Sequence, residues 1–473
     1  MSVITRHAPL LPGIPVAGAP AAPRPDQLLA PGSLLLAHAR PGWAIDLPRH
    51  QAIWGPLPEP DLHALSTTAE QMGLVGHGGA GFPTWRKLRS MAGDEAGPVI
   101  VNGSEGETAS GKDTVLLTHV PHLVLDGAVA AARALGSRQV IVRVPEVRTR
   151  VIGALRAAIA ERGCESVRID VAPGPETFIA GEATAVISAL EGKQALPAPQ
   201  TKPPTMRAGV RRRPVLLSNV ETFARLALAA RGCRLTSTLV TVSGAVGTPG
   251  VMEVPTGTTI GELLEMAGAD PYLAAVITGG WHGSWLAAGS ATYGLPFSRS
   301  ALKAHGVHFG AGALIAIPAD PCPALALEAI ADYLLGAGAG QCAPCVLGLA
   351  AARQDLQRGE PVRDRVQGQR VVRPSDRHFG STAIRSAATG RRTGRSRPRT
   401  MRGDPMTNTT NATVAIDWRR CRGHGVCSAA LPELIELDDW GFPVLDAEVP
   451  QHLVTAARLA QAICPAAALR LRT

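Results

Sequence analysis

Short apolar runs alternate with amphipathic stretches through the first half of the chain. The runs are rich in Val and Ile, which is typical of buried strands, and the stretches between them repeat apolar residues at helical spacing. Strands that alternate with helices indicate βαβ units and a parallel sheet, so residues 65–235 are predicted to form an α/β domain. The expected strands include 99–101, 139–144 and 167–171, and the expected helices include 120–135 and 149–162.

The pattern changes after residue 237. An alternating segment, a Gly-Thr-Pro-Gly turn, a second strand, a helix over 260–267 and a strand over 275–278 predict a ββαβ arrangement within residues 238–318. Residues 323–357 are predicted to be mostly helical. A separate small α+β domain is expected over residues 412–473.

Two further segments lack a folding pattern. Residues 1–64 are rich in Pro and Ala, which predicts an extended lead-in. Residues 358–411 are Arg-rich and non-periodic, which predicts a disordered linker. Between Arg363 and Arg402 there are 12 Arg, no Lys and two Asp, so this tract accounts for the net charge of +9. The rest of the chain is close to neutral, and we expect no nucleic-acid partner.

Composition places the chain among ordinary folded proteins, with 45% hydrophobic and 4% aromatic residues. No run of 18 apolar residues predicts a membrane span, and the N-terminus lacks the pattern of a secretion signal. A cytoplasmic location is therefore expected.

A glycine-rich stretch is the first candidate for ligand chemistry. Four glycines lie between Gly76 and Gly81, followed by Phe82 and, within a helix predicted over 83–90, by Lys87. Glycines leave backbone N–H groups accessible, and a helix start with a nearby cation favours a phosphate. A simple turn that caps a helix is the alternative.

Polar residues follow the strand predicted at 99–101, at the end where open α/β sheets bind ligands. They include Asn102, Glu105 and Glu107. Carboxylates on a glycine-containing turn accept hydrogen bonds from ribose hydroxyls or from a nicotinamide amide. A solvated acidic loop fits the same residues.

Later segments complete an ordered set of motifs, and residues 65–350 resemble one family in their order and spacing. This is the flavin-bearing, NADH-oxidising subunit of respiratory complex I, with its relatives in NAD-linked hydrogenases and formate dehydrogenases. The resemblance implies FMN and NADH bound face to face in one cavity. The later segments are Phe178-Ile-Ala-Gly-Glu-Ala-Thr-Ala185, Leu190-Glu-Gly-Lys193, Lys202-Pro-Pro204 and Ser218-Asn-Val-Glu-Thr222.

Position by position, the resemblance implies a set of cofactor-binding residues and no catalytic side chain. It also identifies residues 238–318 as similar to the ubiquitin-like SLBB β-grasp domain, which is expected to brace the flavin site. The implied cofactor residues are Gly76, Gly78, Gly79, Gly81, Phe82 and Lys87 at the phosphates, Asn102, Glu105 and Glu107 on the cavity floor, Gly181, Glu182, Asn219 and Thr222 at the flavin, and Lys202 near the nucleotide.

Four positions depart from the residues usual in this family. His77 stands where Arg is common, Ser104 where Asp is usual, Phe178 where Tyr is common and Ala183 where a second Glu is usual. Each replacement removes a charge or a hydrogen-bonding group. Affinity or nucleotide preference is therefore expected to differ from that of the respiratory enzymes.

The cysteines suggest metal chemistry at two places, and the first of these is incomplete. Cys342 and Cys345 match the second and third ligands of the family's [4Fe–4S] site, but Ala339 occupies the first ligand position. No cysteine lies between Cys345 and Cys421, and two thiolates alone do not hold a cubane. A frameshift within 353–406 would explain both the lost ligand and the Arg-rich tract. Isolated Cys164, Cys233 and Cys322 are interpreted as buried structural residues.

The second place is the C-terminal domain, where Cys421 and Cys427 flank a glycine-rich loop and Cys464 precedes a proline. Residues 412–473 resemble small single-cluster bacterial ferredoxins, including those that feed cytochromes P450. His424 stands at the middle cysteine position of the four-iron pattern. Two alternatives follow: a [3Fe–4S] cluster on the three cysteines, or a [4Fe–4S] cluster with His424 as fourth ligand. A zinc site or free thiols would be the structural alternative.

The resemblances together predict an NADH oxidoreductase with an attached ferredoxin. Electrons would pass from NADH to FMN, then to the cluster, and then to a redox partner such as a cytochrome P450 or another monooxygenase. An acidic docking face for that partner is expected at Glu433, Glu436, Asp438 and Asp439. Two alternatives stay open: a noncatalytic scaffold with a degenerate flavin site, and a subunit of a complex I-like or hydrogenase-like assembly.

Overall fold

The computed structural model describes two compact units. The first unit holds the described residues up to 354, and the second holds those from 412 onward. The described residues are 34–36, 39, 43–92, 96–163, 166–197, 210, 213–320, 323–339, 350, 353–354, 412–417, 421, 426–437, 443–445, 448–464 and 467–472.

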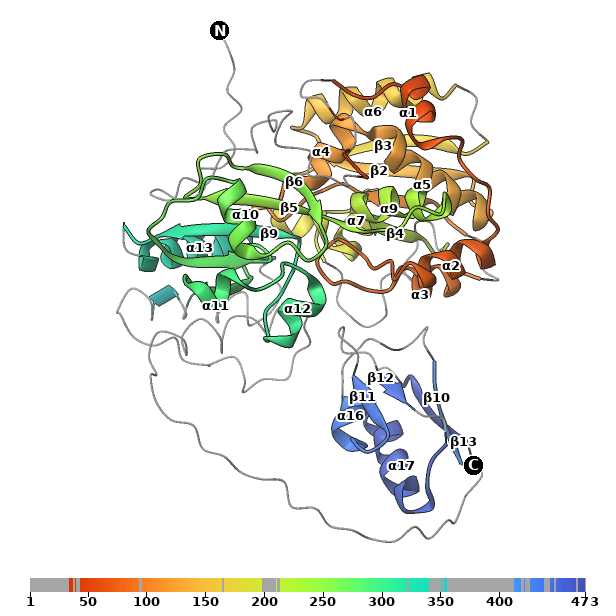
Figure 1. The fold of residues 1–473 in the computed structure, drawn as a ribbon. Coiled ribbons are helices and arrows are strands. Elements are labelled where there is room, and N and C mark those ends of the chain that lie inside the picture. Colours follow the sequence, from red (N-terminus) through yellow and green to blue (C-terminus); the bar gives the residue numbers. More distant parts are fainter. Residues whose placement is uncertain are drawn as a thin grey trace. The chain divides into compact units, whose positions relative to one another are not determined.

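A four-stranded sheet forms the centre of the first half of the first unit (Figure 1). All of its pairings are parallel, in the order β3-β2-β1-β4. The α/β class with a parallel sheet is thus confirmed. The strands are β1 (Val99–Asn102), β2 (Gln139–Pro145), β3 (Arg168–Gly174) and β4 (Leu216–Asn219).

Helices pack on both faces of this sheet. Val99 and Val101 belong to the core that includes helices α5 and α9, whereas Ile100 and Leu217 pack with α7 on the other face. The two faces alternate along each strand because successive side chains point to opposite sides. The helices are α1 (Leu47–Trp54), α2 (Leu62–Gln71), α3 (Thr84–Arg89), α4 (Lys112–His119), α5 (Pro121–Ala134), α6 (Thr149–Glu161), α7 (Ala183–Leu190) and α9 (Val220–Ala230), with the 3-10 helix η2 (Phe178–Gly181) before α7.

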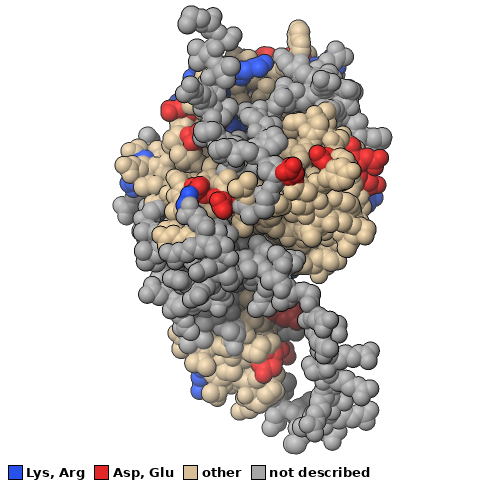
Figure 2. Space-filling view, turned by 90° about the vertical axis from the view of Figure 1, so that its left-hand side faces the viewer, with Lys and Arg blue, Asp and Glu red and all other residues tan. Residues whose placement is uncertain are grey.

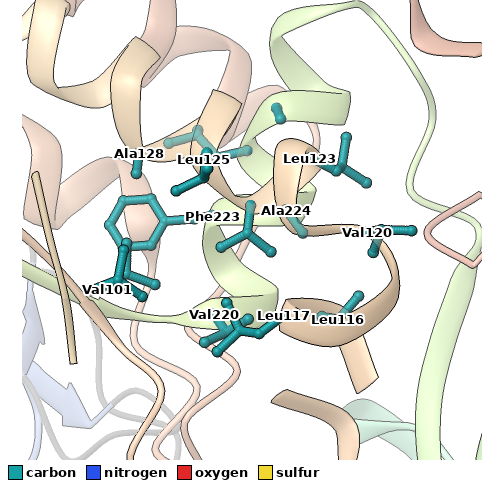
Figure 3. Packing of buried hydrophobic residues seen from close by; sticks show 14 of the residues in the cluster. Val101, Leu116, Leu117, Val120, Leu123, Leu125, Ala128, Val220, Phe223 and Ala224 are labelled. Carbon is teal, nitrogen blue, oxygen red and sulfur yellow. The ribbon is translucent and has the colours of Figure 1, made fainter. Parts of the chain in front are cut away.

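Helices α5 and α9 lie in close contact over the sheet (Figure 3). Gly127 of α5 faces the backbone of Phe223 of α9, and a Cβ at Gly127 would clash with the Phe223 carbonyl oxygen. The Phe223 ring packs near Val101 and Ala128 in the same core. The absence of a side chain at Gly127 therefore sets the position of α9, whose first turn carries Thr222.

The prediction of an extended segment over residues 1–64 is wrong for α1. The Asp46 carboxylate caps this helix by accepting a hydrogen bond from the Arg49 amide at 2.9 Å. A proline in the first helical turn, here Pro48, is compatible with a helix because its missing N–H would have no partner there. Leu35 and Leu36 are also fully buried in the core.

A five-stranded sheet follows, in the order β6-β5-β9-β7-β8. Only the β5–β9 pairing is parallel within this sheet. One face packs on Ile260, Leu263 and Phe297, and the other on helix α13. The elements are β5 (Ser237–Gly244), β6 (Gly250–Pro255), α10 (Ile260–Met266), β7 (Leu273–Thr278), β8 (Ser284–Ala287), α11 (Ser290–Tyr293), α12 (Arg299–Ala304), β9 (Ala313–Pro318) and α13 (Pro323–Ala337).

The second unit is small and has a core of its own. Cys427 is buried in this core with Leu431, Ile435 and Ala457. Two antiparallel strand pairs, β10–β13 and β11–β12, accompany its helices. The elements are β10 (Thr413–Ile416), α16 (Val426–Ala430), β11 (Ile435–Leu437), β12 (Pro443–Leu445), the 3-10 helix η5 (Gln451–Leu453), α17 (Val454–Ile463) and β13 (Leu469–Arg472).

Among the described residues, no single helix has both the length and the apolar composition needed to cross a bilayer. Helices α4 and α5, which meet at a bend of 95°, are together long and apolar enough for a membrane span by length and composition alone. Leu116, Val124 and Ala128 of this pair are buried in the core of the first unit.

The contact between α5 and α9 can be tested with two glycines on helices. We expect Gly127→Ala to lower the free energy of unfolding by about 3 kcal/mol, because the new Cβ would push α9 away. Gly153→Ala on α6 is the matched control, because a Cβ there meets nothing within 4 Å. This control should stabilise the helix by about 0.5–1 kcal/mol. Equal results for the two variants in urea unfolding would contradict the close packing.

Candidate functional site

The glycine loop is closed at its base. The Gly76 amide donates to the Phe82 carbonyl at 2.8 Å, and an antiparallel bridge pairs the flanking residues. Gly79 and Gly81 adopt φ angles of 108° and 68°, which residues with a Cβ rarely take. The loop therefore requires glycine at these two positions for its shape.

Backbone donors in this loop lack partners. The N–H groups of Gly78, Gly79, Ala80 and Gly81 make no hydrogen bond with any described residue. Consecutive backbone N–H groups of this kind form a concave site for an anion. The geometry supports the predicted phosphate loop, although α3, which follows it, has only six residues.

Lys87 contributes a partly buried cation next to the loop. Its Nζ donates to the Leu217 carbonyl of β4 at 2.8 Å, and no carboxylate pairs with it among the described residues. Burial lowers the pKa of Lys87 to about 8. A nearby phosphate would oppose that shift, so Lys87 fits a site for a bound anion.

The two predicted asparagines lie side by side at the carboxyl edge of the sheet. Asn102 of β1 pairs in register with Asn219 of β4. Asn102 Nδ2 donates to the Gly181 carbonyl at 2.8 Å, and Asn219 caps α9 through the Glu221 amide at 3.0 Å. A Cβ built at Gly78 would lie 3.5 Å from Asn219 Cβ. The edge of the sheet thus brings together the glycine loop, β1, β4 and η2.

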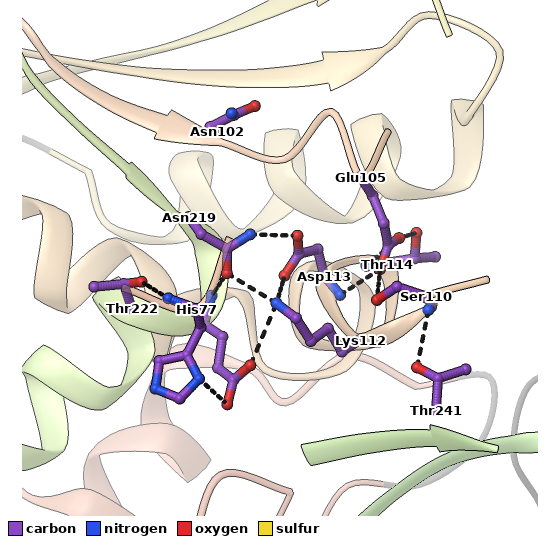
Figure 4. A network of polar contacts seen from close by, with 12 residues as sticks. His77, Asn102, Glu105, Ser110, Lys112, Asp113, Thr114, Asn219, Thr222 and Thr241 are labelled. Carbon is purple, nitrogen blue, oxygen red and sulfur yellow. Dashed lines mark hydrogen bonds and ion pairs between the residues drawn. The ribbon is translucent and has the colours of Figure 1, made fainter. Parts of the chain in front are cut away.

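A buried network centred on Lys112 connects the glycine loop, α4, the end of β4 and the start of α9 (Figure 4). Lys112 Nζ lies 2.7 Å from Asp113 Oδ1, 2.9 Å from Asn219 Oδ1 and 3.3 Å from Glu221 Oε2. Glu221 also contacts His77 Nδ1 at 3.1 Å and Arg225 Nε at 2.8 Å. These contacts hold the glycine loop against the start of α9.

The protonation states in this network follow from burial and from the neighbouring charges. Burial lowers the pKa of His77 to about 4 despite the opposing Glu221 carboxylate, so His77 is neutral at pH 7. Burial opposes ionisation of Lys112, but the carboxylates of Asp113 and Glu221 raise its pKa. Burial raises the pKa of Asp113 to about 6, helped by Glu105 and opposed by Lys112.

The Glu105 carboxylate is engaged by neighbouring protein groups. Its carboxylate accepts hydrogen bonds from the Asp113 amide at 2.8 Å and the Thr114 hydroxyl at 2.6 Å, and it pairs with Arg148 at 2.6 Å. Its backbone has a φ of 41°, which is unusual for a residue with a side chain. These contacts tie the Glu105 carboxylate to α4 and Arg148, and its predicted place on the cavity floor stays a prediction.

Glu107 connects the parallel-sheet domain to the five-stranded region. Its carboxylate accepts hydrogen bonds from the Trp281 amide at 3.2 Å and the Ala109 amide at 3.1 Å. Trp281 in turn donates from its indole to Thr108 at 2.8 Å. Glu107 therefore lies at the boundary of the two regions, next to the β7–β8 turn.

The segment around η2 completes this edge. Glu182 caps α7 by accepting from the Thr184 amide at 2.7 Å and the Ala185 amide at 3.0 Å. A Cβ at Gly181 would lie 3.5 Å from Ser104 Cβ. Ser104 Oγ is buried without a hydrogen-bond partner among the described residues.

Sequence reasoning missed two features of this site. The buried cluster of Lys112, Asp113 and Glu221 lies at its centre, although Lys112-Asp113 follows the acidic loop closely in sequence. Arg299 of α12 reaches the Gly79 carbonyl with Nη1 at 3.1 Å. No local pattern indicates this last contact, because 220 residues separate the partners.

The second unit places its described cysteines around one core. Cys464 Sγ accepts a hydrogen bond from the Ala468 amide at 3.3 Å. Burial raises the pKa of the Cys427 thiol, and the nearby Cys464 adds to this shift. Cys421 is partly buried, and its amide donates to the Asp417 carbonyl at 2.9 Å. The proximity of Cys427 and Cys464, and the N–H···S bond, fit thiolate ligands of a cluster.

Several predicted residues lie outside the described residues. They include the nucleotide residue Lys202, the alternative cluster ligand His424, the incomplete pair Cys342 and Cys345, and the Arg-rich tract of 358–411.

On the face shown in Figure 2, the described basic side chains are separated from one another, with acidic ones among them.

Family comparisons match three parts of the chain. Residues 69–228 match the Nuo51 FMN-binding domain, residues 239–269 the SLBB domain, and residues 414–471 the 4Fe-4S single cluster domain. The FMN-binding and single-cluster descriptions agree with the predicted flavin and iron–sulfur cofactors.

Two curated relatives are similar to part of the chain. An NADH-quinone oxidoreductase subunit of Rhizobium meliloti (strain 1021) is 29% identical over 321 residues, which cover 62% of this chain and 75% of the relative. The alpha subunit of the NAD-reducing hydrogenase HoxS of Cupriavidus necator is 36% identical over 236 residues, which cover 44% of this chain and 38% of the relative.

A solved structure of an NAD+-reducing hydrogenase is also similar to this chain. The crystal structure of an NAD+-reducing [NiFe]-hydrogenase in the air-oxidized state superposes with a TM-score of 0.57 at 28% identity, covering 63% of this chain and 54% of that chain. The predicted kinship with NADH dehydrogenase-type oxidoreductases is therefore confirmed. Residues 69–228 are thus similar to the Nuo51 FMN-binding domain, residues 239–269 to the SLBB domain and residues 414–471 to the 4Fe-4S single cluster domain.

Proposed function

We propose that this chain is a flavin-dependent oxidoreductase that takes a hydride from NADH and passes single electrons to its own iron–sulfur domain. The observation that carries the proposal is the run of N–H groups from Gly78 to Gly81, which make no hydrogen bond with any described residue and are followed by the cation Lys87. Such a site suits the phosphate of a flavin or dinucleotide. The names of the relatives, which include an NADH-quinone oxidoreductase and an NAD-reducing hydrogenase, support NADH as the reductant.

The protein's own residues would bind and orient the cofactors. The glycine loop and Lys87 would hold phosphate, while Asn102, Gly181 and Asn219 would surround the flavin at the edge of the sheet. FMN, when bound, accepts two electrons as a hydride and releases them one at a time. Cys421, Cys427 and Cys464 would bind the cluster that receives these electrons. The cluster type, with three irons or with four and His424, stays a prediction.

The partner and location follow from the same proposal. Both relatives are named as subunits, so an assembly with complex I-like or hydrogenase-like proteins is one setting. The other is a free two-domain protein in the cytoplasm whose ferredoxin domain reduces a monooxygenase such as a cytochrome P450. Exposed Glu433 and Glu436 belong to the acidic face expected to dock that partner.

The electron path can be tested in the full-length protein after reconstitution with FMN, iron and sulfide. NADH should bleach the flavin band and change the electron paramagnetic resonance signal of the cluster. Cys427→Ser should keep the flavin bleaching and lose the cluster signal, because it removes one thiolate. Cys233→Ser in the first unit, with no predicted cluster role, should behave as the wild type.

A wild-type protein that binds no FMN would overturn the proposal and favour the scaffold alternative. Flavin bleaching without any change at the cluster would retain the dehydrogenase but reject the internal electron path.

Lys87 provides a test of the phosphate site. Lys87→Gln should weaken FMN or dinucleotide binding about tenfold, because a charge-assisted hydrogen bond to phosphate is lost. Arg89→Gln is the control on the same helix, because Arg89 pairs with Glu70 at the surface. Fluorescence titration of the deflavinated protein measures both, and equal affinities would exclude Lys87 from the site.

The neutral state of His77 predicts a pH dependence of stability. An unfolded histidine titrates near its ordinary pKa of 6.5, whereas folded His77 titrates at about 4. The unfolded state therefore binds more protons between these values, and stability falls as pH is lowered through this window. Compared with His77→Gln, the wild type should lose about 3 kcal/mol between pH 7 and pH 4. Parallel stability curves for the two proteins in urea titrations would show that His77 has the same pKa in the folded and unfolded states, which would contradict the lowered pKa of the folded state.

A further inference from the structure

Arg299 brings a cation to the glycine loop from the five-stranded sheet and its helices, which we call the SLBB region because its first part, residues 239–269, matches the SLBB domain. It begins α12, and its Nη1 donates to the Gly79 carbonyl while Nη2 donates to the Gly310 carbonyl, both at 3.1 Å. Its guanidinium carbon lies 4.8 Å from the centre of the Phe309 ring. Two backbone carbonyls and one ring face thus fix the guanidinium at the loop.

The Arg299 guanidinium forms no ion pair with a carboxylate among the described residues. Glu221 is the acidic group that influences it, but Glu221 already contacts Lys112, His77 and Arg225. Burial lowers the pKa of Arg299 to about 10, and Glu221 only partly opposes this shift. A partly buried cation without a matching anion is unfavourable, and an anionic ligand would relieve that cost.

The donors at this position match one chemical class of ligand. A guanidinium has five N–H donors, and the contacts to the Gly79 and Gly310 carbonyls use two of them. The unpartnered amides of the loop lie in the segment that Arg299 contacts through Gly79. A planar fork next to a row of backbone N–H groups suits the oxygens of a phosphate.

We infer that Arg299 binds a phosphate group of the nucleotide held by the glycine loop, so the SLBB region supplies a ligand to the site as well as packing against it. The phosphate belongs either to the flavin or to the dinucleotide, and the inference rests on the proposed function. A purely bracing Arg299 would instead affect stability while leaving nucleotide affinity unchanged.

Two ligands distinguish the sources in the full-length protein. Arg299→Met should weaken binding of FMN to the deflavinated protein, or of ADP-ribose to the flavin-loaded protein, by about ten- to a hundredfold. The dissociation constant for the affected ligand should also rise less steeply with salt in the variant, because one charge pair is lost. ADP-ribose carries the pyrophosphate without the nicotinamide, so its affinity reports on phosphate contacts apart from hydride transfer.

Two further variants keep the test decisive. Lys303→Met is the matched control, because it removes an exposed cation from the same helix, and it should change neither affinity. Arg299→Lys keeps the charge without the fork, so it should weaken the same ligand several-fold and keep the salt dependence. It also serves if the methionine variant fails to fold.

Wild-type affinities for both ligands in Arg299→Met, or in Arg299→Lys where only that variant folds, would overturn the inference and leave a bracing role. A wild-type protein that binds neither ligand would instead overturn the proposed function itself, so the two failures are distinguishable.

Discussion

The candidate site depends on one buried cation, Lys112. Its ammonium group contacts Asp113, Asn219 and Glu221, which belong to α4, the end of β4 and the start of α9. Removing it would leave two buried carboxylates near each other without their shared partner, a change that typically costs several kcal/mol. Because Glu221 also contacts His77, Lys112 indirectly fixes the glycine loop. The N–H groups proposed to bind phosphate therefore depend on a charge that need not touch the cofactor.

The elements with local patterns could be predicted from the sequence. Val and Ile runs indicated β1 and β2. The glycines of the loop indicated unpaired N–H groups, and within the described part of the chain those of Gly78 to Gly81 have no partner. Helix α1 was missed because the many prolines around it indicate an extended chain, although a proline in the first turn of a helix is compatible with that helix. The ion pair between Glu105 and Arg148 could not be predicted either, because 43 residues separate the two partners.

Contacts between distant segments explain why the site itself was only partly predictable. Glu107 lies beside Trp281, which is 174 residues further along the chain. Propensity and periodicity describe neighbours in sequence, whereas these pairs form only when the two sheets pack together. The family resemblance supplied the order of the motifs, and the structure supplied the contacts between the flavin-binding part and the SLBB region.

The distribution of charge around the glycine loop gives the departures from the family a physical meaning. His77 stands where the resemblance leads us to expect an arginine, and burial keeps it neutral at pH 7, so the loop carries no charge at that position. Arg299 lies close enough to lower the pKa of His77 further, although it comes from the other region of the unit. Among the described residues, Arg299 contacts the loop through the Gly79 carbonyl, and Lys87 follows the loop in the sequence. If Arg299 binds phosphate, nucleotide affinity requires the SLBB region to be correctly packed, and loosening that packing would weaken binding before it altered the flavin-binding fold.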